Sequence, residues 1–452
     1  MIINLMKKFL NKIGVDKAIY YTVLSRILQS LSGIITVLLI AYLFSKEEQG
    51  YYYTFGSVLA LQLFFELGLG AIITQFVAHE MSGCSINTSN QIEGDKDKIS
   101  RLSSLLRFCV KWYLVVSFFL FIVLVFIGLL FFNNFESDTS TVNWRTPWIL
   151  LSFFASLNLL ISPIMSFLQG LHKMKEMAYM LFIQRLAIII SVIIGLIFGF
   201  KLGICAINSS VAFITLLILY LRSDYLKILK SIYRVKLTEK ISYKNEIFPF
   251  QWRIGVSWAS GYLINYLFNP IIFALIGASV AGQFGMTMTI YISITSLTIS
   301  WTSTKIPLWS DFISKQMFQK LDLSFNKVLK NSTFVSLFLV VSFLIVLISL
   351  SYFNIGLSER FLPLHLVLLI SITVPINNIL NTLASQLRCH KKEPYALQSF
   401  IIGILVTSST LINSKFYDIN SLVICYVVII IFITLPWSLI IFKSYRRKYR
   451  LR

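Results

Sequence analysis

The side chains most able to do chemistry are a few ionisable groups inside long apolar runs. Arg26, Arg185 and Lys305 are three such cations, and Glu66 is the one carboxylate well inside such a run. In hydrocarbon a charged side chain costs at least about 2.5–3.5 kcal/mol at mid-depth, so these groups should face protein or water. The cations suit contact with an anionic substrate. No residue pattern predicts a catalytic group or a metal site.

Each buried cation has a simpler interpretation beside the functional one. Arg26, in SRILQSLSG, shares a helical side with Gln29, Ser30 and Gly33, but it is near the start of its run and could snorkel to the interface. Arg185, in LFIQRLAIII, lies about eight residues into its run, where snorkelling is harder. The alternatives for Arg185 are an ion pair or a crossing that starts later. Both arginines are candidate cavity residues.

Glu66, in LFFELGLG, has two roles open to it. It could pair with one of the cations as a structural counter-ion. It could also titrate as a coupling site for protons or sodium. The sequence favours neither role.

Residues 250–316 form the most unusual stretch, because its second apolar run carries many hydroxyls. In TSLTISWTSTK and the preceding turn, Tyr291, Thr298, Trp301 and Lys305 trace approximately one helical side. A hydroxyl in hydrocarbon needs a partner, so this helix should line protein or a path. An aromatic beside a cation suits sugar or phosphate contact, although Trp and Lys also mark membrane interfaces.

Two stripes of small and amide side chains recur every four residues. One joins Ser257, Gly261, Asn265 and Asn269, and the other joins Asn377, Asn381, Ser385 and Arg388. Such stripes hold membrane helices together or bind ligand, and packing is the more common of the two uses. Asn265 is included among the candidate substrate contacts.

The composition is that of an integral membrane protein. The 452 residues are 57% hydrophobic and only 13% charged, so a soluble globule would expose large apolar patches. The net charge of +21 resides in short segments between apolar runs rather than on one soluble face, which disfavours nucleic-acid binding. The five cysteines show no metal-ligand spacing, and no disulfide, metal or cofactor is expected.

Apolar runs long enough to span about 30 Å of hydrocarbon predict an all-α fold with twelve transmembrane helices. The predicted crossings are residues 20–44, 50–78, 108–132, 147–170, 177–199, 203–221, 254–276, 283–306, 332–353, 361–387, 395–414 and 420–442. They divide into a six-helix bundle over 1–221, a basic cytoplasmic linker over 222–252, and a second six-helix bundle with a basic tail over 253–452. A weak repeat at a shift of 235 residues, matching Gly50 to Gly285, implies pseudo-two-fold parallel repeats.

The loop charges predict the orientation. Most Lys and Arg residues fall in the terminal segments and in alternate loops, whereas the opposite loops hold only Lys46, Arg145, Lys201, Arg360 and Lys415. Positive loops remain inside, so both termini should be cytoplasmic. The basic start leads into an apolar run without a convincing cleavage site, so the first crossing should remain as an anchor.

The chain resembles a known family over most of its length. The residues that carry the likeness are the run RILQSLSGIITVLLIAYLFSKEEQGYYYTFGSVLALQLFFELGLGAIITQFVAHE and the segments QWRIGVSWASGYLINYLFNP, AGQFGMTMTI and SWTSTKIPLW. They look like polysaccharide repeat-unit flippases (O-antigen, Wzx type) of the multidrug/oligosaccharidyl-lipid/polysaccharide exporter superfamily. The resemblance implies two bundles forming a V, as in MATE exporters, with a central cavity open to one side at a time. It also implies a cationic lining that includes Arg26, Arg185 and Lys305.

The function implied by this resemblance is translocation of a polyprenyl-diphosphate-linked oligosaccharide from the inner to the outer leaflet of the bacterial cytoplasmic membrane. The expected partners are that lipid, membrane lipids, other polysaccharide-assembly proteins and a coupling Na⁺ or H⁺. One alternative is a cation-coupled drug exporter of the MATE branch, which would need an acidic cavity. Another is a membrane glycan polymerase or glycosyltransferase, but the predicted external acidic residues, Glu136, Asp138, Glu359 and Asp418, are scattered.

Overall fold

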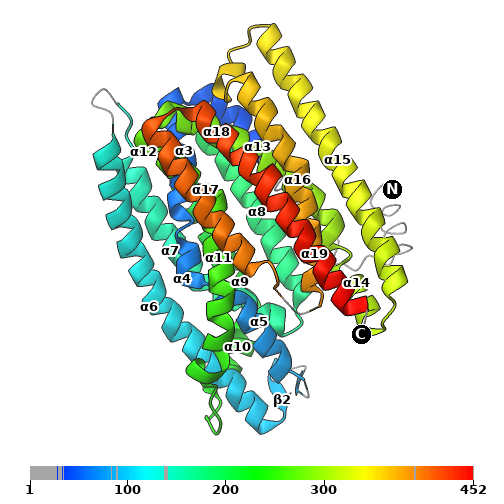
Figure 1. Ribbon diagram of the computed structural model, residues 1–452. Coiled ribbons are helices and arrows are strands. Elements are labelled where there is room, and N and C mark those ends of the chain that lie inside the picture. The colour runs from blue at the N-terminus through cyan, green and yellow to red at the C-terminus, as the bar shows by residue number, and fades with distance from the viewer. Residues whose placement is uncertain are drawn as a thin grey trace, which may run out of the picture. The chain divides into compact units, whose positions relative to one another are not determined.

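The computed structural model describes residues 28, 33, 35–82, 84–87, 90–136, 141–390 and 393–450. Arg26 and much of the first predicted crossing lie outside these residues. The described part is almost entirely helical, with one two-stranded sheet (Figure 1). This agrees with the expected all-α class.

Contacts group the chain into two compact units. The N-terminal unit consists mainly of Leu61–Glu136 and Asn143–Trp258, and the C-terminal unit consists mainly of Gly33–Ala60 and Ala259–Arg452. The segment that contains the start of the second predicted crossing is therefore grouped with the second half of the chain. The predicted division into bundles at 221 and 253 remains a prediction.

In the N-terminal unit three helices follow the predicted crossings 147–170, 177–199 and 203–221 within three residues, whereas the helix at the predicted crossing 108–132 already begins at Lys96. The elements are α4 (Gln62–Glu66), α5 (Leu69–Glu80), β1 (Cys84–Ile86), β2 (Ile92–Gly94), α6 (Lys96–Phe135), α7 (Arg145–Gly170), α8 (Met174–Ile197), α9 (Gly203–Leu221), α10 (Tyr225–Arg234), the π-helical turn η1 (Tyr243–Ile247) and the first part of α11 (Phe248–Asn265). Helix α7 packs on α5, α6 and α9, and α8 packs on α9.

The C-terminal unit begins with α3 and ends at the C-terminal helix. Its elements are α3 (Lys46–Leu59), the end of α11, α12 (Phe268–Leu275), α13 (Ala278–Ser303), α14 (Ile306–Ser314), α15 (Phe318–Tyr352), the 3₁₀ turn η2 (Ser358–Arg360), α16 (Leu364–Arg388), α17 (Ala396–Phe416), α18 (Ile419–Val428), the π-helical turn η3 (Ile429–Thr434) and α19 (Leu435–Arg450). Helix α13 packs on α3, α12, α15 and α16.

Nine stretches of the described residues are long and apolar enough to cross a membrane. They are the run α3–α5, the helices α6, α7, α8, α9, α15, α16 and α17, and the run α18–α19. The eighth predicted crossing corresponds to α13. This helix is rich in Ser and Thr and is not among the nine stretches. The seventh is not one helix, because the chain breaks between Asn265 and Phe268.

The second predicted crossing is also interrupted. Leu67 and Gly68 adopt left-handed φ values of 45° and 70°, which end α4 and start α5. A Cβ on Gly68 would lie 2.3 Å from Cγ2 of Ile254, so glycine is needed here both for its backbone angle and for the close approach of α11. A broken helix at membrane depth is typical of transporter sites.

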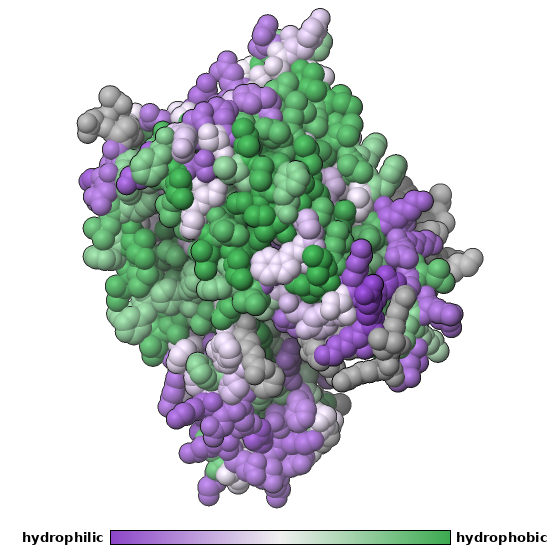
Figure 2. Space-filling view, viewed as in Figure 1, coloured by the Kyte–Doolittle hydropathy of each residue, from purple (hydrophilic) through white to green (hydrophobic). Residues whose placement is uncertain are grey.

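Side chains beyond the crossings hold the polar end of the N-terminal unit together. Arg101 Nε donates to Glu80 Oε1 at 2.9 Å, and its Nη2 donates to Glu246 Oε2 at 2.6 Å. These bonds tie the ends of α5 and α6 to the turn before α11. Figure 2 shows hydrophobic residues over α6 and α7 and hydrophilic residues gathered over α10 and β2.

In the C-terminal unit, α3 lies against α13 at very short range. A Cβ on Gly50 would lie 1.9 Å from the carbonyl oxygen of Ala278, so only glycine permits this contact. Gln49 Nε2 donates to the carbonyl oxygens of Gly282 and Arg360, both at 2.9 Å. The Gln49 side chain on α3 is therefore held by backbone carbonyl oxygens of α13 and of the η2 turn.

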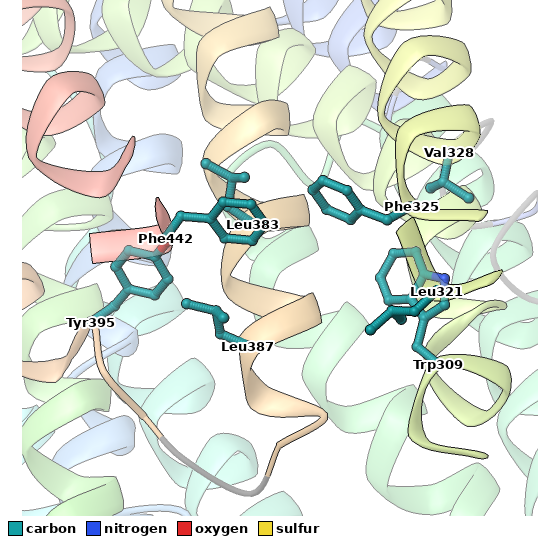
Figure 3. Packing of buried hydrophobic residues seen from close by; sticks show 8 residues of the cluster. All are labelled: Trp309, Leu321, Phe325, Val328, Leu383, Leu387, Tyr395 and Phe442. Carbon is teal, nitrogen blue, oxygen red and sulfur yellow. The ribbon is translucent and has the colours of Figure 1, made fainter. Parts of the chain in front are cut away.

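A hydrophobic cluster joins α14, α15, α16 and α19 in the same unit. Its buried members are Trp309, Leu321, Phe325, Val328, Leu383, Leu387, Tyr395 and Phe442. Figure 3 shows Phe442 close to Leu383, with Trp309 beside Leu321. Rings of Phe325 and Phe442 stack with centroids 5.3 Å apart. The cluster holds the C-terminal part of α16, a helix that contributes to the cavity described next.

Candidate functional site

A cavity of about 510 Å³ lies inside the C-terminal unit. Its walls come from the end of α11 and from α13, α16, α17, α18, η3 and α19. This volume is in the range of small-molecule sites.

The lining of the cavity combines neutral polar groups with aromatic rings. Its side-chain amides belong to Asn265, Asn377, Asn381 and Gln398, its hydroxyls to Thr295, Ser296, Thr373, Ser399, Thr434 and Ser438, and its aromatic rings to Tyr291, Tyr395 and Tyr426. Amides and hydroxyls match the hydroxyls of a glycan, and aromatic rings cover its apolar faces. No acidic side chain is among the described residues that line it.

Arg388 is the one charged side chain in this lining among the described residues, and its charge is balanced. Its Nε and Nη2 atoms form a bidentate pair with the Glu393 carboxylate at 2.8–3.0 Å. Glu393 itself does not line the cavity. The wall therefore presents a neutral surface to a ligand.

Several cavity residues are held by hydrogen bonds that also position the helices. The hydroxyl of the buried Tyr291 donates to the Val367 carbonyl oxygen at 2.8 Å, so its ring is fixed against α16. Gln398 Nε2 donates to Ser438 Oγ at 2.7 Å and to the Thr434 carbonyl oxygen at 3.0 Å. These contacts join α17 to η3 and α19 across the cavity wall.

Two amides retain hydrogen-bonding capacity. Asn265 Nδ2 donates to the Gly261 carbonyl oxygen at 2.8 Å, and no described residue donates to its side-chain oxygen. The Asn381 side chain makes no hydrogen bond with a described residue, although its backbone carbonyl accepts from Ser385. Both amides line the cavity and are available to a ligand.

Glu66 lies in the N-terminal unit, at the break between α4 and α5. Ser162 Oγ, on α7, donates to Glu66 Oε1 at 3.1 Å. A Cβ on Gly70 would lie 3.0 Å from Glu66 Oε1 and 2.9 Å from Ser166 Oγ, so the carboxylate is surrounded by hydroxyls and backbone. Among the described residues, no Lys or Arg forms an ion pair with it.

The other predicted site residues are dispersed. Arg185 is half-buried on α8 of the N-terminal unit. Trp301 is 44% exposed near the end of α13, and Lys305 is exposed at the start of α14, so neither lines the cavity. Arg26 lies outside the described residues. Of the predicted set, the structure brings Asn265 and Tyr291 together.

The second amide stripe contributes more to the cavity than the sequence indicated. The sequence leaves both helix packing and ligand binding open for Asn377, Asn381 and Arg388, and all three line the cavity. Their four-residue spacing was the available signal. It could not show whether the stripe faces a neighbouring helix or a space.

Among the described residues, no group of three or more His, Cys, Asp or Glu side chains could hold a metal ion. The chemistry available in the cavity is hydrogen bonding and ring stacking. This is the chemistry of binding.

Solved structures with the same fold include MATE family transporters and a lipid II flippase. An inward-facing multidrug resistance MATE family transporter of the MOP superfamily superposes with a TM-score of 0.65 at 12% identity, covering 92% of this chain and 96% of that one. The lipid II flippase MurJ in an inward closed conformation gives 0.65 at 14% identity, covering 95% and 87%. An outward-facing MATE transporter gives 0.59 at 12%, covering 95% and 96%.

These likenesses establish that the chain shares the fold of these membrane proteins. No curated protein matches the chain significantly. A family model described as polysaccharide biosynthesis protein matches residues 15–313, about two thirds of the chain. The resemblance found in the sequence is thus confirmed: the chain belongs to the polysaccharide biosynthesis protein family.

Proposed function

We propose that this protein moves a polyprenyl-diphosphate-linked oligosaccharide from the inner to the outer leaflet of the bacterial cytoplasmic membrane, for assembly of a surface polysaccharide such as O-antigen, capsule or exopolysaccharide. The observation that carries the proposal is the neutral cavity of the C-terminal unit, lined by amides, hydroxyls and tyrosines, in a chain of this family. A glycan head group needs such a lining because it is too polar to cross lipid unaided.

Transport proceeds by alternating access, with twelve crossings and both termini in the cytoplasm. The sugar occupies the cavity near Asn265, Tyr291 and Asn381, while the lipid tail remains in the bilayer. Arg26, Arg185 and Lys305 contact the diphosphate, and Trp301 is a further sugar contact. The family membership and the position of Arg185 in α8, a helix long and apolar enough to cross a membrane, support this assignment.

Glu66 is the proposed coupling site for H⁺ or Na⁺. Its support is local: the carboxylate sits at a helix break and accepts a hydrogen bond from Ser162. Hydroxyl and carboxylate oxygens can hold a small cation, and a carboxylate can instead carry a proton. Broken helices place such groups at transporter sites.

Drug export is a weaker candidate, although MATE transporters share the fold. A cationic drug would be favoured by acidic side chains, and none is among the described residues lining the cavity. Fold similarity at 12% identity carries no substrate assignment.

The proposal is tested with purified protein in liposomes that contain a fluorescent polyprenyl-diphosphate oligosaccharide. The expected result is protein-dependent exposure of the glycan to an impermeant lectin. Exposure at the rate of protein-free liposomes would overturn the function. In cells, Arg26→Ala and Arg185→Ala at unchanged protein level should abolish surface glycan. If cells with each variant keep their full amount of surface glycan, these arginines are not part of the mechanism. The liposome test of the function would still stand.

A further inference from the structure

A second pocket, of about 520 Å³, lies in the N-terminal unit between α10 and the β1–β2 hairpin. It is lined by three cations, Lys227, Lys230 and Arg234, together with the hairpin residues Asn90 and Gln91. Helix α10 contacts β2, and both lie in the hydrophilic region of Figure 2. The pocket shares no lining residue with the cavity of the C-terminal unit.

The sequence of α10 places the three cations together. Ile228, Leu229 and Ile232 are buried, which orients the helix against α6. Lys230 and Arg234 are four residues apart, and Lys227 precedes Lys230 by three, so all three occupy the opposite side. The apolar side of the helix thus fixes the direction in which the charges point.

Arg107 holds the end of α10 in place. Its Nε and Nη2 donate to the Tyr233 carbonyl oxygen at 3.1 and 2.8 Å, and Nη2 also donates to the Val235 carbonyl oxygen at 2.9 Å. Its guanidinium lies 5.2 Å from the centroid of the Tyr233 ring. A cation is favourable at a helix C-terminus, and here it also makes the pocket wall rigid.

The charge in the pocket is only partly balanced. Lys227 Nζ pairs with Asp224 Oδ1 at 2.8 Å, but both side chains are largely exposed, and such pairs are weak. No described acidic residue pairs with Lys230 or Arg234, and none lines the pocket. Glu93 on β2 accepts from Asn87 Nδ2 at 2.7 Å instead.

We propose that this pocket binds a phosphate group. Lys230 and Arg234 provide the charge, with Lys227 as a third contact, and the side-chain amides of Asn90 and Gln91 provide neutral donors. Arginine and lysine donors together are a common setting for phosphate. The phosphate belongs to an anionic phospholipid headgroup of the inner leaflet or to a soluble phosphate compound. The inference does not depend on the transport function, because the pocket residues belong to the N-terminal unit and the proposed glycan cavity belongs to the C-terminal unit.

The test uses the full-length detergent-solubilised protein and native mass spectrometry. The protein is titrated separately with dioleoyl phosphatidylglycerol and with inorganic pyrophosphate. Lys230→Gln/Arg234→Gln should weaken binding of at least one probe by about tenfold to thirtyfold, since each cation near an anionic surface contributes about 1 kcal/mol. Loss for the lipid alone identifies a headgroup site, and loss for pyrophosphate alone identifies a soluble ligand.

Two matched variants distinguish binding in this pocket from attraction to the positive charge of the whole segment. Lys236→Gln/Lys240→Gln removes the same charge from the same segment outside the pocket and should leave binding unchanged. Lys230→Arg/Arg234→Lys keeps the charge and should retain binding within about threefold. Equal binding of both probes by the wild type and the glutamine pair, or equal weakening by the two glutamine pairs, would overturn the proposal.

Discussion

Ser162 Oγ donates a hydrogen bond to Glu66 Oε1 at 3.1 Å, and this bond joins α7 to the point where α4 ends. The carboxylate therefore lies at an interruption of a membrane-spanning run rather than along a regular helix. The serine fixes one carboxylate oxygen, and no described residue donates to the other.

Glu66→Gln should uncouple transport from the ion gradient. The amide keeps the size of the side chain but can neither release a proton nor neutralise a cation. We expect at least about a tenfold slower gradient-driven flipping in liposomes, equal to about 1.4 kcal/mol. Glu66→Asp should retain a gradient response. If Glu66→Gln responds to H⁺ and Na⁺ gradients as the wild type does, Glu66 is a structural counter-ion.

Asn381→Ala should impair transport without unfolding the protein. Its side chain makes no hydrogen bond with a described residue, so its removal leaves no described partner unsatisfied. The loss of one ligand hydrogen bond, about 0.5–1.5 kcal/mol, predicts about a twofold to tenfold weaker apparent affinity for the lipid-linked glycan. Ser385→Ala, one turn further along α16 and outside the lining, is the control. Equal effects of the two changes would argue against sugar contact at Asn381.

Tyr291→Phe should distinguish the role of the Tyr291 ring from the role of its hydroxyl. The hydroxyl donates to the Val367 carbonyl oxygen, whereas the ring lines the cavity. We expect a loss of about 0.5–1.5 kcal/mol in unfolding free energy, because the Val367 carbonyl loses this hydrogen bond but keeps its place in the backbone ladder of α16. Transport should persist below the unfolding temperature. A transport defect with unchanged thermal stability would instead assign the hydroxyl to the substrate.

Gly68→Ala should destabilise the break in the second crossing. The new Cβ would lie 2.3 Å from Ile254 Cγ2, at a φ of 70° that L-residues rarely adopt. The expected cost is about 1–3 kcal/mol, measured by thermal unfolding in detergent. Adding Ile254→Ala should recover part of it by removing the clash, although the backbone strain remains. No recovery in the double variant would show that the steric contact contributes nothing.

Glu246 should make the polar end of the N-terminal unit sensitive to acid. Partial burial raises the pKa of this carboxyl, but hydrogen bonds from the Ser242 N–H and the Arg101 guanidinium outweigh it, so the pKa is lowered. A lowered pKa stabilises the fold above the ordinary Glu value of about 4.3. That stability disappears as pH falls through the lowered value.

Thermal unfolding between about pH 6 and pH 3 checks this expectation. The wild type should lose stability in the acid part of the range. Arg101→Gln should already be less stable at pH 6 and should show a flatter profile. A profile of the same slope in both proteins would remove this ion pair as the cause.

The long apolar helices could be predicted closely from the sequence. Helix α9 has the bounds 203–221 of the sixth predicted crossing, and α8 differs from its predicted crossing by only a few residues. Their apolar runs are bounded by charged or glycine-containing turns. Hydrophobic length alone therefore determined them.

The interruptions could not be predicted in the same way. The run through Leu67 remains apolar on both sides of the break, so hydropathy gives no signal, and Gly68 is one glycine among several. Gly68 packs closely against Ile254, which is far away in the sequence. The cavity posed a similar problem, because the spacing of Asn377 and Asn381 defines a helical face but not what that face meets.

No side chain separates Gly50 from the carbonyl oxygen of Ala278. A junction of backbone against backbone has no rotamer that could swing aside to admit one water molecule. At this point α3 and α13 can therefore separate only if the backbone itself moves, because no side-chain rotation opens a gap between Gly50 and Ala278.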